Sequence, residues 1–266
     1  MEYVRARTIV ITGLVLALVA VLAIITVREV LRPGPGCTTA LGEGAGTVTV
    51  EQADNAATIA GVGLAMDMPD HAVTVALATA MQESGLRNLP DGDRDSAGLF
   101  QQRPSQGWGT LAQVTDPVYA ATAFYAKLRT EPDWPTLSVT EAAQLVQRSA
   151  TPEAYARWEP MARSLARALT GEDPAAMTCH SLTLSVPGED VATVAAAELG
   201  TARLSGPQPP ARGWAIATWL VAHAARLGVD TVTYDGRTWT AHEGTWSGDG
   251  PSDGMLSLHR ASPSAA

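Results

Sequence analysis

The residue best placed for acid–base chemistry is Glu83, at the end of a long apolar segment. Asp70 can cap a helix, and the residues after it, HAVTVALATA, are apolar on nearly every side. Gly85 suits a left-handed helix stop, so we expect Glu83 in the last turn of a buried helix, beside the negative end of its dipole. Burial and the helix terminus both favour the protonated acid. Glu83 is therefore a candidate general acid of the kind that a glycosidic oxygen needs.

A lone glutamate at a helix end is most often a surface residue, so the case for Glu83 depends on its neighbours. Glu83-Ser84-Gly85 is followed by Gly98-Leu99-Phe100-Gln101, then by the segment AQLVQRS with Gln147, and then by Tyr155. This order resembles the lysozyme-like soluble lytic transglycosylases and their goose-type lysozyme relatives, here in a chain that looks like an actinobacterial membrane-anchored protein. The most specific parts are Glu-Ser-Gly and Gly-Leu-Phe-Gln at their mutual spacing.

The resemblance implies roles for individual residues. Glu83 would act as general acid and then as base, with Ser84 supporting it. Gln101 would form a hydrogen-bonding wall of the sugar cleft, and Tyr155 would lie near the reacting sugar. Gln147 falls where the family usually has an asparagine. The implied activity is cleavage of peptidoglycan glycan strands, without a cofactor.

A second carboxylate would decide which reaction follows. Hydrolases generally use a partner carboxylate, whereas lytic transglycosylases can use one acid and a hydroxyl of the sugar itself. Asp93 and Asp95 are the candidates, while Asp91 is best interpreted as part of a solvated loop. The run DGDRDSAG also resembles the start of a calcium loop, but a glutamine stands where the twelfth-position glutamate is needed. The hydrolase and transglycosylase outcomes both stay open.

Aromatic and histidine residues give weaker evidence for a functional site. Trp108 lies between two glycines and could be a platform on which a sugar stacks, or equally a core or lid residue. The histidines lack metal-type spacing and are better interpreted as helix-end or surface residues, so no metal site is predicted. They are His71, His180, His223, His242 and His259.

Hydrophobic periodicity gives the elements that must position these side chains. Apolar residues recur at three and four positions along the middle of the chain, which predicts a mainly α, lysozyme-like domain. The expected helices lie near 52–66, 71–84, 116–130, 139–148 and 152–169. Helices near 189–199 and 211–227 and strand-like runs at 231–234 and 255–259, the first followed by an Asp235-Gly236 turn, predict a small C-terminal α/β domain.

The small C-terminal α/β domain looks like a module of other actinobacterial cell-wall proteins. It would bind the wall or a partner, or serve only for packing.

The sequence suggests six consecutive parts. The expected parts are a cytoplasmic N-terminus at 1–7, a transmembrane anchor at 8–27, a linker at 28–47, a lysozyme-like domain at 48–180, a linker at 181–188, and the small α/β domain at 189–266 with a ragged C-terminus.

The anchor is expected from Thr8 to Val27, because twenty residues without a charge are long enough as a helix to span a bilayer. Arginines follow directly, which favours an uncleaved anchor over a signal peptide. The expected location is the cell membrane, with a single pass and most of the chain outside the cytoplasm. Cys37 and Cys179 bracket the proposed catalytic segment, which favours a disulfide over two unrelated buried thiols.

Charge restricts the partners. Acidic residues outnumber basic ones by 27 to 18, a net charge of -9, which argues against nucleic-acid binding. The expected partners are peptidoglycan strands and the cytoplasmic membrane through residues 8–27. A non-catalytic wall-binding or scaffold protein is the alternative function, while a single apolar span offers an ion no path and so disfavours a transporter.

Overall fold

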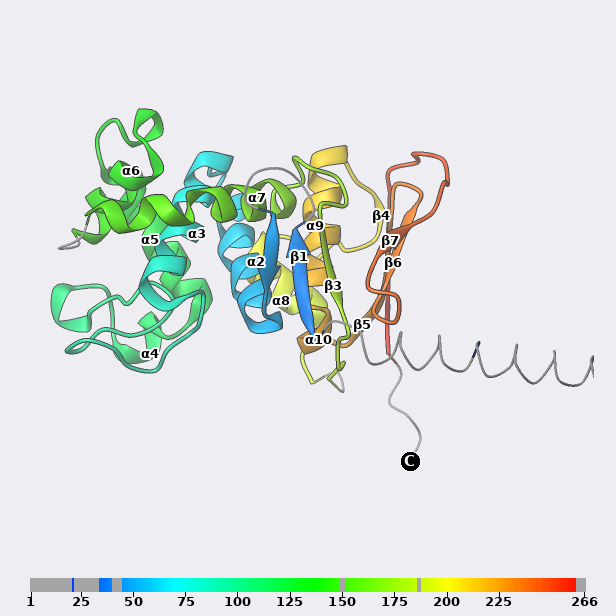
Figure 1. Cartoon of the computed structure of the whole chain (residues 1–266), viewed down its shortest axis with the longest axis horizontal. Coiled ribbons are helices and arrows are strands. Elements are labelled where there is room, and N and C mark those ends of the chain that lie inside the picture. Colours follow the sequence, from blue (N-terminus) through cyan, green and yellow to red (C-terminus); the bar gives the residue numbers. More distant parts are fainter. Residues whose placement is uncertain (1–20, 22–33, 40–44, 149–151, 186–187, 262–266) are drawn as a thin grey trace, which may run out of the picture. The chain divides into compact units, whose positions relative to one another are not determined.

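The computed structural model describes residues 21, 34–39, 45–148, 152–185 and 188–261 (Figure 1). The described residues from Pro35 onward form one compact unit. Its α-helices are α2 (Val50–Ala65), α3 (Asp70–Ser84), α4 (Leu111–Val114), α5 (Pro117–Thr130), α6 (Val139–Gln147), α7 (Glu159–Leu169), α8 (Val191–Leu199), α9 (Pro210–Ala222) and α10 (Ala224–Leu227). Short 3₁₀ helices are η1 (Pro104–Gln106), η2 (Trp134–Thr136) and η3 (Pro152–Trp158).

Two antiparallel sheets accompany these helices. The first has the strand order β2-β1-β3, and the second has the order β4-β8-β5-β6-β7. The strands are β1 (Gly36–Thr39), β2 (Gly46–Val48), β3 (Met177–His180), β4 (Gly206–Pro207), β5 (Val229–Tyr234), β6 (Arg237–Thr240), β7 (Trp246–Ser247) and β8 (Met255–Arg260).

Helix α2 begins with a reciprocal cap and packs closely on its neighbours. The Thr49 hydroxyl accepts a hydrogen bond from the Gln52 N–H, and the Gln52 side chain accepts one from the Thr49 N–H. A Cβ at Gly63 would lie 2.8 Å from the hydroxyl oxygen of Tyr125, so only glycine lets α5 approach this closely. Small residues on α2 therefore allow it to lie at the centre of the helical packing.

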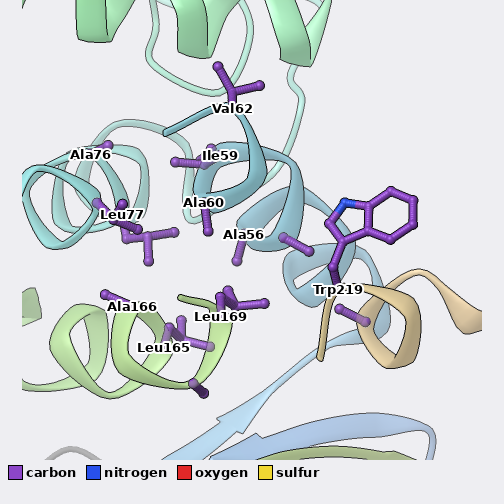
Figure 2. Packing of buried hydrophobic residues seen from close by; sticks show 14 of the residues in the cluster. Ala56, Ile59, Ala60, Val62, Ala76, Leu77, Leu165, Ala166, Leu169 and Trp219 are labelled. Atoms are coloured by element: carbon purple, nitrogen blue, oxygen red, sulfur yellow. The ribbon is translucent and has the colours of Figure 1, made fainter. Parts of the chain in front are cut away.

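One apolar core runs through the described helices and both sheets, and part of it lies between α2, α3 and α7. In Figure 2 the side chains of Ala60, Leu77, Leu165 and Leu169 lie toward one another between these helices, Val62 points away from α7, and Trp219 of α9 lies beside α2. Burial of this apolar surface holds α3 in place. A rigid α3 matters because the candidate acid lies in its last turn.

The disulfide prediction is confirmed. Cys37 of β1 and Cys179 of β3 lie opposite each other in the first sheet, are fully buried, and are bonded across 142 positions of sequence. The bond therefore joins the strand before α2 to the strand after α7, and closes the chain around the helices that carry the candidate site (Figure 1).

The expected fold class needs correction. The sequence predicts a mainly helical domain at 48–180 and sheet only in a small C-terminal domain, whereas the structure is mixed α/β with two sheets. The reason lies in β1, β2 and β3, which have four, three and four residues. Strands this short show little alternation, and they pair with segments far away in sequence, so the Pro- and Gly-rich stretch that holds β1 and β2 was interpreted as a linker.

The second sheet follows the expected pattern more closely. Strands β5 and β8 cover the strand-like runs expected at 231–234 and 255–259. Between β5 and β6, Asp235 and Gly236 have φ angles of 51° and 78°, as a tight two-residue hairpin turn requires. Helix α8 precedes this sheet in the chain, α9 and α10 lie between its strands β4 and β5, and α8 and α9 also pack on α2.

The predicted membrane anchor, and the single-pass location derived from it, are not supported. In the described part of the chain, no helix is long and apolar enough to cross a bilayer. The longest, α2, has 16 residues, which gives a rise of about 24 Å where a bilayer core is about 30 Å thick. Residues 1–7 and, apart from Val21, the expected span 8–27 lie outside the described residues.

Candidate active site

The C-terminal end of α3 positions Glu83. Gly85 ends the helix in the left-handed conformation, and its N–H donates to the carbonyl oxygens of Ala80 and Met81. The buried Ser84 hydroxyl lies 2.8 Å from the carbonyl oxygen of Leu99 and 3.0 Å from that of Ala80. Ser84 thus ties the helix end to the Gly98–Gln101 segment.

The Glu83 carboxylate has a specific partner. The hydroxyl of Tyr155, on η3, donates a hydrogen bond of 2.8 Å to Oε1 of Glu83. Tyr155 is fully buried, whereas Glu83 is half-buried, so the tyrosine holds the carboxylate from the protein side. One oxygen is oriented by this bond while the group as a whole stays accessible from solvent.

The neighbouring residue of α3 also binds η3. Oε1 of Gln82 accepts hydrogen bonds of 3.0 Å from the guanidinium of Arg157 and from the indole N–H of Trp158. The Arg157 guanidinium lies over the Trp158 ring, 4.9 Å from its centroid. No sequence motif marks Gln82, Arg157 or Trp158 as site residues. Together they fix η3, and with it Tyr155, against the end of α3.

The Gly98–Gln101 segment is a tight turn between two helices. At Gly98 the φ angle is 79° and a Cβ would lie 1.9 Å from the Val114 carbonyl oxygen, so a glycine is required. The amide of Gln101 binds within the loop, accepting from the Ser96 hydroxyl and donating to the Gly98 carbonyl. Its side chain thus stabilises the turn, and a role as a cleft wall stays a prediction.

Gln147, at the end of α6, is tied to the same turn. Its Nε2 donates a hydrogen bond of 2.9 Å to the carbonyl oxygen of Phe100. Because Ser84 binds the preceding carbonyl, that of Leu99, two consecutive backbone groups link α3 to α6. The structure therefore brings Glu83, Ser84, Tyr155 and Gln147 into one neighbourhood.

A cavity of about 700 Å³ opens on the Gln147 side of this neighbourhood. Trp108 and Gln147 both line it, so these two candidate sugar-binding residues face the same space. The rest of its lining comes from the loop before Trp108, from α5 and from the end of α6, and consists of Gln106, Gly107, Tyr119, Ala123, Lys127, Val146 and Arg148. Its size suits one or two sugar rings or a short peptide.

The acidic loop places the two candidate second carboxylates differently. Asp95 accepts from the N–H of Ser105 at 2.7 Å and from Nε of Arg103 at 2.8 Å. These hydrogen bonds, those from Ser105 first, hold the pKa of the Asp95 carboxyl well below its ordinary value. The Asp93 side chain is 92% exposed and has only a distant contact with Arg94.

In the part of the chain that the structure describes, no group of three or more histidines, cysteines or carboxylates is arranged to hold a metal ion.

One histidine lies in a buried charged cluster. His223, expected at a helix end or the surface, follows α9 but is completely buried. Its Nδ1 lies 2.5 Å from Asp54 of α2 and its Nε2 lies 2.9 Å from Glu198 of α8.

The same cluster includes Arg226 and Trp219. Arg226 of α10 contacts both carboxylates, at 3.0 Å from Asp54 and 3.3 Å from Glu198, and the Trp219 N–H donates to Glu198 at 2.8 Å. Burial alone would lower the pKa of His223, but the charges of Glu198 and Asp54 outweigh it and raise that pKa to about 9. A doubly hydrogen-bonded imidazolium therefore joins α2 to the C-terminal helices.

This cluster makes stability depend on pH. Because the pKa of His223 is raised from 6.5 to about 9, its contribution is complete below pH 6.5 and is lost as the pH rises through 9. We expect urea unfolding to show a decrease on the order of 3 kcal/mol over that range. The pKa values of Asp54 and Glu198 are lowered by His223 and Arg226 despite burial, so their contribution is lost instead at acid pH.

Two histidine variants test the assignment. His223→Gln should remove most of the alkaline loss, whereas His259→Gln should retain it, because His259 pairs with Asp230 at a site where its side chain is 66% exposed. An equal alkaline loss in the His223 variant would show that the dependence arises elsewhere.

The C-terminal part of the chain is similar to a known protein family. Residues 192–254 match the family model described as "VldE, C-terminal domain". The matched stretch is less than a quarter of the 266 residues, extends from α8 past β7, and contains Glu198 and His223 but none of the predicted active-site residues. No curated protein matches the chain.

Proposed function

We propose that this chain cleaves the glycan strands of peptidoglycan, with Glu83 as the general acid and then the base. The hydrogen bond between Tyr155 and Glu83 supports this proposal most directly. A glutamate that only ended a helix at the surface would need no buried tyrosine to orient it. Ser84, Tyr155 and Gln147, to which the resemblance to lytic transglycosylases and goose-type lysozymes gives roles, lie near Glu83, and a cavity lies beside Gln147.

The surroundings of the acidic loop favour the transglycosylase outcome. Asp95 is engaged by Arg103 and Ser105, and Asp93 points into solvent, so neither is held ready as a partner for Glu83. With one acid, Glu83 donates its proton to the glycosidic oxygen as the bond to the anomeric carbon breaks. The hydroxyl at carbon 6 of the same sugar then bonds to that carbon and returns its proton to Glu83.

Product analysis tests this reaction. Purified peptidoglycan digested by the full chain should yield fragments with 1,6-anhydro ends, which mass spectrometry identifies because they are lighter by one water than fragments with reducing ends. Reducing ends alone would support a hydrolase. Binding to peptidoglycan without any soluble product would support the non-catalytic alternative and contradict the proposal.

Tyr155 is proposed as a positioning residue. Tyr155→Phe removes only the hydroxyl that orients Glu83, so we expect kcat to fall about tenfold with KM little changed. Tyr234→Phe is the matched control, because the Tyr234 hydroxyl also binds backbone carbonyls but lies in the C-terminal sheet. If both variants lose the same activity, or if Tyr155→Phe changes only KM, the positioning role fails.

A further inference from the structure

The cavity beside Gln147 differs in charge from the chain as a whole. The protein has a net charge of -9, yet both charged side chains that line this cavity, Lys127 and Arg148, are cationic. A wall of this kind favours an anionic ligand over a neutral one. Neutral sugar rings alone therefore do not account for the positive charge of the cavity.

Each cation is held differently. Lys127 pairs with Glu131 one turn along α5, and the Glu131 side chain is only 13% exposed, so the lysine is fixed in place and its charge is partly balanced. Arg148 caps α6 with a φ angle of 51° and is exposed. Within the described ranges it forms no ion pair with another side chain. Its planar guanidinium is thus available to bind a carboxylate through two hydrogen bonds.

The remaining lining suits a ligand with peptide-like groups. Trp108 and Tyr119 provide apolar faces with polar tips, and Gln106 and Gln147 provide amides that can pair with amide groups of a ligand. Gln147 also connects this wall to the acid, since it holds the Phe100 carbonyl while Ser84, next to Glu83, holds that of Leu99. A ligand in the cavity would therefore lie beside a glycan bound at Glu83.

We propose that this cavity binds the acidic peptide carried by the glycan strand, with Arg148 pairing to one of its carboxylates. The inference rests on the proposed function for the identity of the ligand, but the cavity and its charge are independent of it. The peptide extends sideways from alternate sugars of the strand and carries free carboxylates. It thus combines the charge, the amides and the position that the cavity requires.

Equilibrium binding to the full chain tests the proposal. The probe is a peptidoglycan disaccharide with its tetrapeptide, compared with the same molecule after its carboxyl groups are converted to amides. Calorimetry should show the acidic form binding about tenfold more tightly, as expected for a hydrogen bond between two charged groups, with the difference shrinking at high salt. Equal affinity for both forms would overturn the proposal.

Variants of Arg148 test whether the tighter binding of the acidic probe arises in this cavity. Asparagine tolerates the positive φ angle of this position, so Arg148→Asn should keep the fold. It should lower the ratio of the affinities for the acidic and amidated probes to nearly one, and Arg148→Lys should restore part of this ratio. Arg203→Ala is the matched control, because Arg203 is exposed and uses only its backbone in hydrogen bonds. A preference unchanged in Arg148→Asn would contradict the inference.

The two proposals fail in different ways. If the wild-type chain releases no fragments from peptidoglycan but still prefers the acidic probe, the catalytic proposal fails and the cavity assignment stands. If it cleaves peptidoglycan but binds both probes equally, only the cavity assignment fails. Tight binding of an anionic phosphate polymer, with none of the disaccharide peptide, would assign the cavity to another ligand and overturn the inference.

Discussion

Glu83→Gln is expected to reduce the release of soluble fragments from peptidoglycan by about a hundred- to ten-thousand-fold. General acid catalysis contributes this much to a rate, and an amide cannot donate a proton to the glycosidic oxygen. The fold should survive, because glutamine has nearly the same shape and its amide oxygen can still accept the bond from Tyr155. The measurement is the initial rate of fragment release, with thermal unfolding as the check on folding.

A neighbouring glutamate provides the matched control. Glu153 is exposed on η3, the element that also carries Tyr155, so Glu153→Gln removes the same charge close to the site. Its rate should remain within about twofold of the wild type, as expected for an exposed residue without a catalytic contact. Unchanged turnover in Glu83→Gln would remove the basis for an enzyme, and equal losses in both variants would indicate a general effect of charge.

The helix that presents Glu83 could be predicted because its signals are local. An apolar run between Asp70 and Gly85 has few alternatives to a buried helix, and α3 ends where Gly85 predicts. Its start differs from the prediction, because Pro69 stands at the N-cap and Asp70, the predicted cap, is the first helical residue. The interactions of the site could not be predicted in the same way. Tyr155 is 72 positions from Glu83, and no local pattern near either residue predicts their hydrogen bond, although the family resemblance placed Tyr155 near the reacting sugar.

The buried cluster around His223 also could not be predicted from the sequence. The sequence around His223, WLVAHAARL, could suggest burial, but its two carboxylate partners come from α2 and α8. A histidine in an apolar helix becomes interpretable only when its partners are known, because burial and carboxylates change its charge in opposite directions. The signal that could have found it is a histidine on a helix with no exposed face.

Loss of the Cys37–Cys179 bond is expected to destabilise the fold by about 4 to 5 kcal/mol. The bond closes a loop of 142 positions, and cross-linking so distant a pair removes much of the entropy of the unfolded chain. Since most domains are stable by only about 5 to 15 kcal/mol, the change should lower the urea midpoint strongly.

The experiment compares one chain in two redox states. Reversible urea unfolding of the wild type, with and without a reducing agent, isolates the bond from any change in packing, because every side chain is kept. The double variant Cys37→Ala, Cys179→Ala is the control, and its midpoint should not respond to the reducing agent. Both cysteines are fully buried, so the folded protein should be reduced slowly and the unfolded protein quickly. A wild-type midpoint that is the same in both states would mean that the β1–β3 pairing, and not the covalent bond, holds these strands together.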